Sequence, residues 1–323
     1  MTVKEVFELR KQGRIEEAYE TIRPMYAVHQ GHYTTICMFW CASDVLRLRI
    51  EQGRMDEALK IFQALVRLYP SMDDMKGRLG HLTLLNHALA LSDKWPEQFS
   101  MIDFMENGGL ESLDEADWKP SQVVPTPEEV AQGKKPHPLP STAAQLVSAV
   151  RRELEATPTP EQALRCVPVL QEALRHSRQN MHFLRLMALI YQITGETQKA
   201  VSIYRELLER PHPQGYLYSE MAALATRTEN KLPLLAKALL LQREERFRTK
   251  LHIQLAGLLI EQNPPLAAYH LQESIRIRQA GGFHISAQQQ QLAKQLESVQ
   301  PVSPAEARQQ MLKLADEVTR IIS

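Results

Sequence analysis

The sequence predicts an all-α fold: a right-handed superhelical solenoid of antiparallel helix hairpins, interrupted by an irregular insert near the middle. Long segments carry apolar residues at the helical period, as at Ala58, Ile61, Phe62 and Leu65. Strand-like alternation of β-branched residues is almost absent, and the 13 glycines fall mostly between the apolar-periodic segments. A fixed spacing of glycine, alanine, an aromatic residue and leucine also recurs, which indicates a repeat architecture.

The repeated spacing places alanine five residues after glycine, an aromatic residue four further on and leucine three further on. Glycine can end the first helix of a hairpin in the left-handed conformation, and alanine lets the second helix approach the first closely. The aromatic residue and the leucine then fill the gap to the next hairpin. The two complete sets are Gly53, Ala58, Phe62, Leu65 and Gly195, Ala200, Tyr204, Leu207, and a partial set is Gly13, Ala18, Ile22.

These residues resemble the tetratricopeptide repeat, most closely at 183–208, where Ala188 and Tyr191 add the positions expected on the first helix. The resemblance covers residues 1–70 and 180–280, and it implies binding of another macromolecule without any catalytic residue to carry over. Weaker repeats follow at 216–242, with Ala236 and Leu240, and at 247–278, with Leu255, Ala256, Ala268, the turn Asn263-Pro264-Pro265, and Gln272 in the aromatic place.

The order of features is also similar to that of a group of bacterial tetratricopeptide proteins of unassigned role. The shared features are the Val-Lys-Glu-Val opening of residues 3–13, the Trp-Lys-Pro at 118–120 and the Pro-Ser-Thr-Ala at 140–143. We divide the chain into hairpins at 1–70, a helical segment without the repeat spacing at 71–118, a proline-rich linker or loop at 119–140, hairpins at 141–282 and terminal capping helices at 283–323.

Helices are expected in the insert at about 72–91 and 98–106. Residues 119–140 contain six prolines, so we expect an extended segment there, with one short helix that begins at Thr126 and is capped by Glu129.

Two helices are expected at about 141–156 and 160–178, with Pro168 kinking the second. Ser303 and Glu306 have the spacing of a capping box. The polar helix that follows suits the open end of a solenoid.

Composition argues for a folded protein and against two classes of partner. Apolar residues make up 44% and charged residues 24% of the chain, as in ordinary globular proteins. Lys plus Arg and Asp plus Glu both total 38, so nucleic acid is not the expected partner. The charged N-terminal stretch has no apolar signal region, and no segment reaches the roughly 18 apolar residues of a membrane span. We expect a cytoplasmic protein.

No residue pattern predicts catalysis, a cofactor or a metal. Phosphate-binding glycine loops and the common hydrolase motifs are absent from the sequence, and His81 and His87 do not share a helical face. The histidines are expected to be surface or hydrogen-bonded residues. The pairs Asp73-Asp74 and Glu128-Glu129 stand at expected helix starts, where the helix dipole favours acidic residues. The three cysteines, Cys37, Cys41 and Cys166, are expected to be buried reduced thiols.

In a stack of hairpins the first helix of each hairpin lines the concave face, so candidate partner-binding residues follow from the register. The alternative is that Trp40 belongs to the core and that the charged side chains are simply solvated. The candidate groove has basic residues but lacks paired asparagines, which argues against a carboxylate-ended chaperone tail as ligand. The candidates are Trp40, Arg47, His182, Arg185, Gln192, Tyr218, Lys250 and Gln254.

Charge is unevenly distributed despite the neutral total. Residues 71–118 are acidic, whereas later segments carry arginine and lysine at 165–185 and 243–250. The two regions could attract each other within the chain or in a homodimer, the basic one could meet an acidic partner, or both could be solvated.

Three functions remain open from the sequence. The first is a protein-interaction scaffold whose groove holds a peptide or helix of another protein. The second is a nucleic-acid binder that uses the basic C-terminal half. The third is an enzyme or accessory subunit with a site in residues 71–140.

Overall fold

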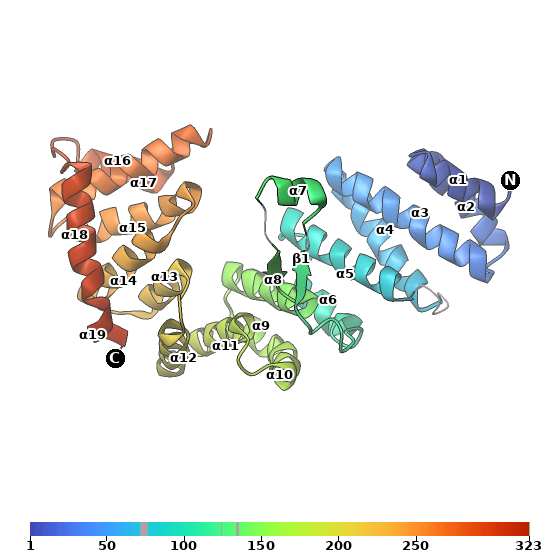
Figure 1. Cartoon of the computed structure of the whole chain (residues 1–323), viewed down its shortest axis with the longest axis horizontal. Coiled ribbons are helices and arrows are strands. Elements are labelled where there is room, and N and C mark those ends of the chain that lie inside the picture. The colour runs from blue at the N-terminus through green and yellow to red at the C-terminus, as the bar shows by residue number, and fades with distance from the viewer. Residues whose placement is uncertain (72–76, 124, 134–135, 323) are drawn as a thin grey trace. The chain divides into compact units, whose positions relative to one another are not determined.

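A computed structural model of the chain describes residues 1–71, 77–123, 125–133 and 136–322. It divides into two compact units, unit 1 (Met1–Leu186) and unit 2 (Met187–Ser323) (Figure 1). Within the described residues regular structure is helical apart from one short two-stranded ribbon. The expected helical class is therefore confirmed.

Unit 1 begins with two helix hairpins and continues through shorter helices and the ribbon. Its last helix, α11, extends across the division between the units. The elements are α1 (Val3–Lys11), α2 (Ile15–Val28), α3 (His32–Glu51), α4 (Met55–Leu68), α5 (Gly77–Lys94), α6 (Met101–Phe104), a π-helical turn (Met105–Gly109), β1 (Ser121–Val123), α7 (Pro127–Ala131), β2 (His137–Leu139), α8 (Thr142–Ala156), α9 (Pro160–Arg165), α10 (Val167–His176) and α11 (Met181–Ile193).

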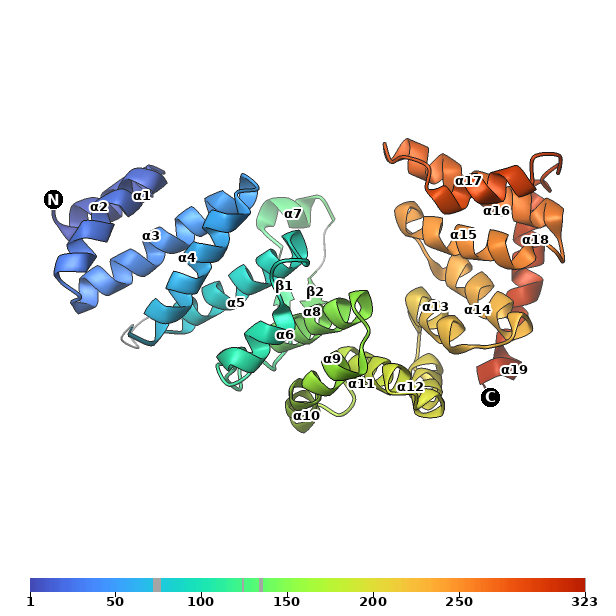
Figure 2. The ribbon, with the colours of Figure 1, turned by 180° about the vertical axis from the view of Figure 1, so that it is seen from behind.

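Unit 2 consists of consecutive helices only, with α15 and α16 forming a close antiparallel hairpin (Figure 2). The elements are α12 (Thr197–Glu209), α13 (Gly215–Leu224), α14 (Thr228–Leu241), α15 (Arg248–Leu259), α16 (Pro264–Ala280), α17 (Ala287–Gln295), α18 (Pro304–Asp316) and α19 (Val318–Ile322).

The glycine–alanine spacing has the structural role that the sequence predicts. Gly53 and Gly195 have φ angles of +71° and +85°, in the left-handed region where a side chain is strained. Ala58 and Ala200, five residues later, are fully buried, so the second helix can approach the first. The aromatic residues four further on, Phe62 and Tyr204, are also buried.

The three cysteines are free and buried, as expected. Cys37 and Cys41 of α3 lie in a core cluster with Val6 of α1 and Ile22 of α2. Their sulfur atoms therefore serve as small apolar groups that join the first three helices.

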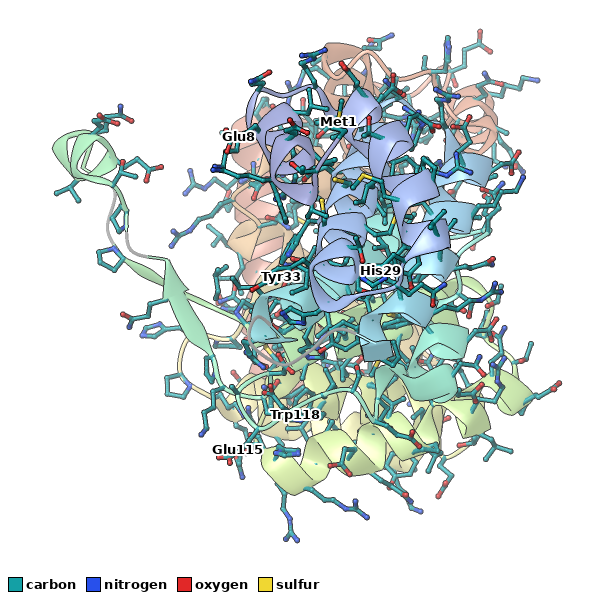
Figure 3. All side chains as sticks on the ribbon, turned by 90° about the vertical axis from the view of Figure 1, so that its right-hand side faces the viewer. Met1, Glu8, His29, Tyr33, Glu115 and Trp118 are labelled. Atoms are coloured by element: carbon teal, nitrogen blue, oxygen red, sulfur yellow. The ribbon has the colours of Figure 1, made fainter. Side chains whose placement is uncertain are left out.

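The insert contains the expected short helix and an unexpected ribbon. Thr126 caps α7, and the Glu129 side chain accepts from the Thr126 backbone N–H, which completes the predicted capping box. Antiparallel β1 and β2 flank this helix, with Gln122 opposite Pro138. Ribbon and helix stand out from the helices of unit 1 (Figure 3). The start expected at Met72 and the pair Asp73-Asp74 lie outside the described residues.

Two local predictions need correction. The helix expected at 160–178 is interrupted at Cys166 rather than kinked, because Pro168, near the start of α10, has no N–H to continue the helical ladder. Ser303 accepts from the Glu306 backbone N–H as expected, but the Glu306 carboxylate accepts from Gln310 instead of the cap. That capping box is therefore only half formed.

The C-terminal helices return across unit 2. α18 packs mainly against α14 and also contacts α16, and α19 contacts α14. Ala307, Met311 and Ala315 of α18 are buried in this contact region. The expected terminal cap thus covers an earlier hairpin as well as the last one.

Candidate partner-binding groove

A hollow of about 290 Å³ lies along α13 and α15 in unit 2, with further walls from α14 and α17. We call this hollow the groove. Small residues open it: Ala222 and Ala223 on α13, and Gly257 on α15. A methyl group placed on Gly257 would meet no atom within 4 Å. Because glycine in a helix interior costs about 1 kcal/mol relative to alanine, its presence here gives up helix stability and leaves the groove wide.

The groove contains one cation. Lys231 of α14 lines it, and among the residues that the structure describes its ammonium group has no hydrogen-bond or ion-pair partner. The neighbouring lining residue Gln254, on α15, is half-buried. The groove therefore combines an apolar floor with groups that can meet the charge or amide of a bound chain.

The sequence-predicted residues of unit 2 fall in different places. Gln254 lines the groove, and Lys250 is exposed one helical turn earlier on the same helix. Tyr218 does not line the groove. Its side chain is only 5% exposed, and it borders a different cavity at the start of α13. Gln192 is exposed at the end of α11 and does not line the groove.

The α11 candidates of unit 1 are partly buried. The Nδ1 atom of His182 lies 2.9 Å from the Ser148 hydroxyl oxygen of α8, and burial lowers the pKa of His182. Arg185 is half-buried. His182 therefore belongs to the packing between α8 and α11, whereas Arg185 keeps part of its side chain exposed.

Trp40 and Arg47, the candidates on α3, both contact neighbouring side chains of unit 1. Trp40 is half-buried and packs edge-on against Phe39, with ring centroids 5.3 Å apart. The guanidinium of Arg10 lies 5.5 Å from the Trp40 ring centroid. Arg47 is exposed and lies 3.7 Å from the carboxylate of Asp44. Intramolecular partners thus occupy both side chains.

A larger cavity, of about 600 Å³, was not predicted from the sequence. It lies in unit 1 between α4 and α6, where Phe62, Phe99 and Phe104 form an aromatic cluster. The π-helical turn that follows α6 forms part of its wall through Gly108 and Gly109. No sequence motif marks this cavity, because it depends on how α6 packs after the long loop from α5.

A polar network in the insert joins Arg78 and His81 to two aspartates, Asp114 and Asp117. His81 Nε2 lies 2.8 Å from Asp117 Oδ2, and Arg78 lies 3.0 Å from Asp117 Oδ1 and also pairs with Asp114. His81, Asp114 and Asp117 have the mutual distances of metal ligands, but Arg78 already supplies the positive charge there. Since Asp117 is buried and its carbonyl accepts from Ala143 of α8, the network ties α5 to α8.

Acidic and basic segments do attract each other within unit 1. The Nε atom of Arg165 lies 3.0 and 3.1 Å from the two Glu106 oxygens, and Arg165 also binds Asp103. The hydrogen bonds that Arg165 donates to Glu106 and Asp103 raise the pKa of Arg165.

Part of the basic segment at 243–250 already has intramolecular partners. Its four cations are Arg243, Arg246, Arg248 and Lys250. Arg246 pairs with Glu244 at 2.8 Å, and Arg248 donates to the Gln242 carbonyl at 2.8 Å. Two of its four cations therefore already have intramolecular partners.

Two family models match parts of the chain. Residues 47–71, the end of α3 with α4, match the model of the tetratricopeptide repeat. This match supports a tetratricopeptide-like family. Residues 185–317 match a domain of unknown function (DUF7017), and they span α12 to α18, including the groove. No curated protein matches the chain. Among the described residues, no helix combines the length and apolar character that a bilayer-spanning segment requires.

Proposed function

We propose that the chain is a non-catalytic scaffold whose groove in unit 2 holds a peptide segment or helix of another protein. The observation that carries the proposal is the hollow walled by Ala222, Ala223 and Gly257 beside a cation, Lys231, that has no intramolecular partner among the described residues. The tetratricopeptide match at 47–71 adds support, because such repeats generally mediate contacts between proteins.

The groove is better suited to binding the side chains of a partner protein than to catalysing a reaction. Its volume of about 290 Å³ is at the lower end for small-molecule sites. Among the described residues that line it, none is His, Asp, Glu or Cys, so it offers no ordinary general acid–base pair. Ser219, its one hydroxyl, donates to the Tyr216 carbonyl at 2.8 Å. These features favour binding over catalysis.

The test is affinity capture from the source cell's lysate with the full chain, at low and at moderate salt, with bound protein and nucleic acid both identified. Gly257→Leu fills the groove, and Lys231→Glu reverses its charge. Binding of the captured protein should weaken at least about tenfold in each variant, which corresponds to about 1.4 kcal/mol.

Two matched variants control for unrelated effects. Gly257→Ala adds one methyl group at the same position, and Gln272→Leu adds the same leucine on the exposed side of α16. Both should bind within about twofold of wild type. A partner that binds Gly257→Leu as tightly as wild type would exclude the groove. Recovery of nucleic acid alone, and only at low salt, would favour a nucleic-acid binder instead.

A further inference from the structure

A second cavity of unit 2, of about 690 Å³, lies between the start of α13 and the end of α14. It shares no lining residue with the groove. Its walls come from the turn before α13, from the first residues of that helix, and from the last turns of α14 with the residues that follow. The groove-binding proposal does not use any of these residues.

Tyr218, whose side chain is largely buried, gives this cavity a hydroxyl donor. The side chain is 5% exposed, lines the cavity, and its hydroxyl has no hydrogen-bond partner among the described residues. The hydroxyl oxygen is not fully enclosed by protein, so solvent or a small molecule can reach it. Burial raises the pKa of Tyr218, which keeps the hydroxyl protonated. The hydroxyl of a tyrosine this deeply buried normally has a partner, so an unpaired one in the wall of a cavity points to a ligand.

The start of α13 adds a second kind of donor. Gln214 is the N-cap residue, but its side chain makes no capping hydrogen bond. The backbone N–H of Gly215 has no acceptor within the described parts of the chain. Uncapped N–H groups and the positive end of the helix dipole favour an anion. Gly215 also lies against α14, since a methyl group there would be 3.0 Å from the Ala238 carbonyl oxygen.

Two cations complete the lining. Lys237 and Arg243 both line the cavity, and neither has an ion-pair or hydrogen-bond partner among the described side chains. The one carboxylate of the lining, Glu244, is already bound by Arg246 at 2.8 Å. His212 and Tyr216 are the remaining titratable groups of the wall besides Tyr218. Cations near the end of α14 would suit its dipole, but that role explains neither the unpaired hydroxyl nor the cavity.

We infer that this cavity binds a phosphate monoester, with the phosphate group between Tyr218, Lys237, Arg243 and the start of α13. Several donors that line one cavity match the three terminal oxygens of a phosphate better than the two of a carboxylate. The cavity is also much larger than a phosphate group alone, so it has room for the organic part of the ester. A small molecule and a phosphorylated side chain are the two sources of such an ester, and both present the same group.

The experiment uses the full chain and calorimetric titration at constant ionic strength with phenyl phosphate, a phosphoserine peptide and benzoate. We expect at least one monoester to bind at least about tenfold more tightly than benzoate. The tighter of the two monoesters identifies the source of the group. Tyr218→Phe, which keeps the ring, and Lys237→Gln should each weaken that binding about tenfold.

Lys231→Gln, which removes the cation of the groove, is the matched control and should leave monoester binding unchanged. Thermal unfolding of each variant verifies that the fold is intact. Absence of binding by both monoesters, equal binding of benzoate, or binding that is insensitive to Tyr218→Phe and Lys237→Gln would each overturn the assignment. Protein capture that is unchanged in Gly257→Leu and Lys231→Glu, together with monoester binding that depends on Tyr218 and Lys237, would contradict the groove and leave this site standing.

Discussion

Hairpins α3–α4 and α15–α16 are both antiparallel helix pairs, but they have different residues at the repeat positions. In the first, Gly53 makes the turn at φ +71°, and Ala58 and Phe62 are buried. In the second, Asn263 stands at the glycine position and caps α16 with its side chain. Buried Ala268 keeps the alanine position, whereas exposed Gln272 takes the place of the aromatic residue.

In the second hairpin, polar contacts stand in for the turn glycine and the aromatic residue. His252 of α15 and His270 of α16 are both buried, with their Nδ1 atoms 2.9 Å apart. Asn263 Nδ2 also donates to Gln310 of α18 at 2.8 Å, so the returning C-terminal helix holds the turn. Both hairpins therefore require the small residue at the helix contact, whereas the residues at the turn and at the aromatic position can be exchanged.

The largest expected difference is at the aromatic position. Phe62 packs against Phe99 and Phe104, with ring centroids 5.4 and 5.9 Å apart. Phe62→Ala should therefore lower the free energy of unfolding of unit 1 by about 3 to 5 kcal/mol. Gln272→Ala, at the matching exposed position, should change that of unit 2 by less than about 0.5 kcal/mol. Equal losses for the two variants would contradict the comparison.

Urea denaturation can follow the two units separately. All three tryptophans, Trp40, Trp95 and Trp118, are in unit 1, so their fluorescence reports that unit. Far-ultraviolet circular dichroism reports both units, and the difference between the two signals isolates unit 2.

The histidine pair should make the α15–α16 hairpin sensitive to acid. Burial lowers the pKa of His252 to about 4 and that of His270 to about 3. Because the unfolded chain takes up protons more readily, stability is full above about pH 6.5 and falls as the pH drops towards 4. For the first proton, a shift from 6.5 to about 4 corresponds to a loss of about 3 kcal/mol.

The matched variant is His252→Leu/His270→Leu, which removes both titrating groups and the unpartnered Nε2 atom of His270. Its unit 2 should keep its stability between pH 6.5 and 4 in circular dichroism denaturation. Unit 1 is the internal reference, because burial also lowers the pKa of His87, to about 4, and the variant leaves that group unchanged. If unit 2 of the variant still loses stability between pH 6.5 and 4 as the wild type does, the acid sensitivity does not come from the histidine pair.

The two turns should show smaller effects of similar size. Gly53→Ala introduces left-handed strain of about 1 to 2 kcal/mol, and Asn263→Ala removes a cap that contributes about 1 kcal/mol. Gly257→Ala, inside α15, should have the opposite sign and stabilise by about 1 kcal/mol. Thermal unfolding of the three variants compares them. A neutral Gly53→Ala would show that the turn does not depend on glycine.

The sequence predicted what local periodicity controls and missed what depends on tertiary packing. The roles of Gly53, Ala58 and the Thr126 cap follow from spacing alone and agree with the structure. Tyr218 is one position from Ser219 of the groove wall in the sequence, but packing places it at another cavity, so its role in partner binding stays a prediction. The aromatic cavity of unit 1 had no signal, since its residues come together only when α6 packs on α4.

The most direct test of partner binding in the groove is hydrogen–deuterium exchange of the full chain with and without the captured partner protein. Binding in the groove predicts slower exchange of the amides of α13 and α15, with little change in α16, whose exposed side includes Gln272. Slower exchange confined to α16, or to α5 and α6 of unit 1, would contradict the assignment of the groove as the partner-binding surface.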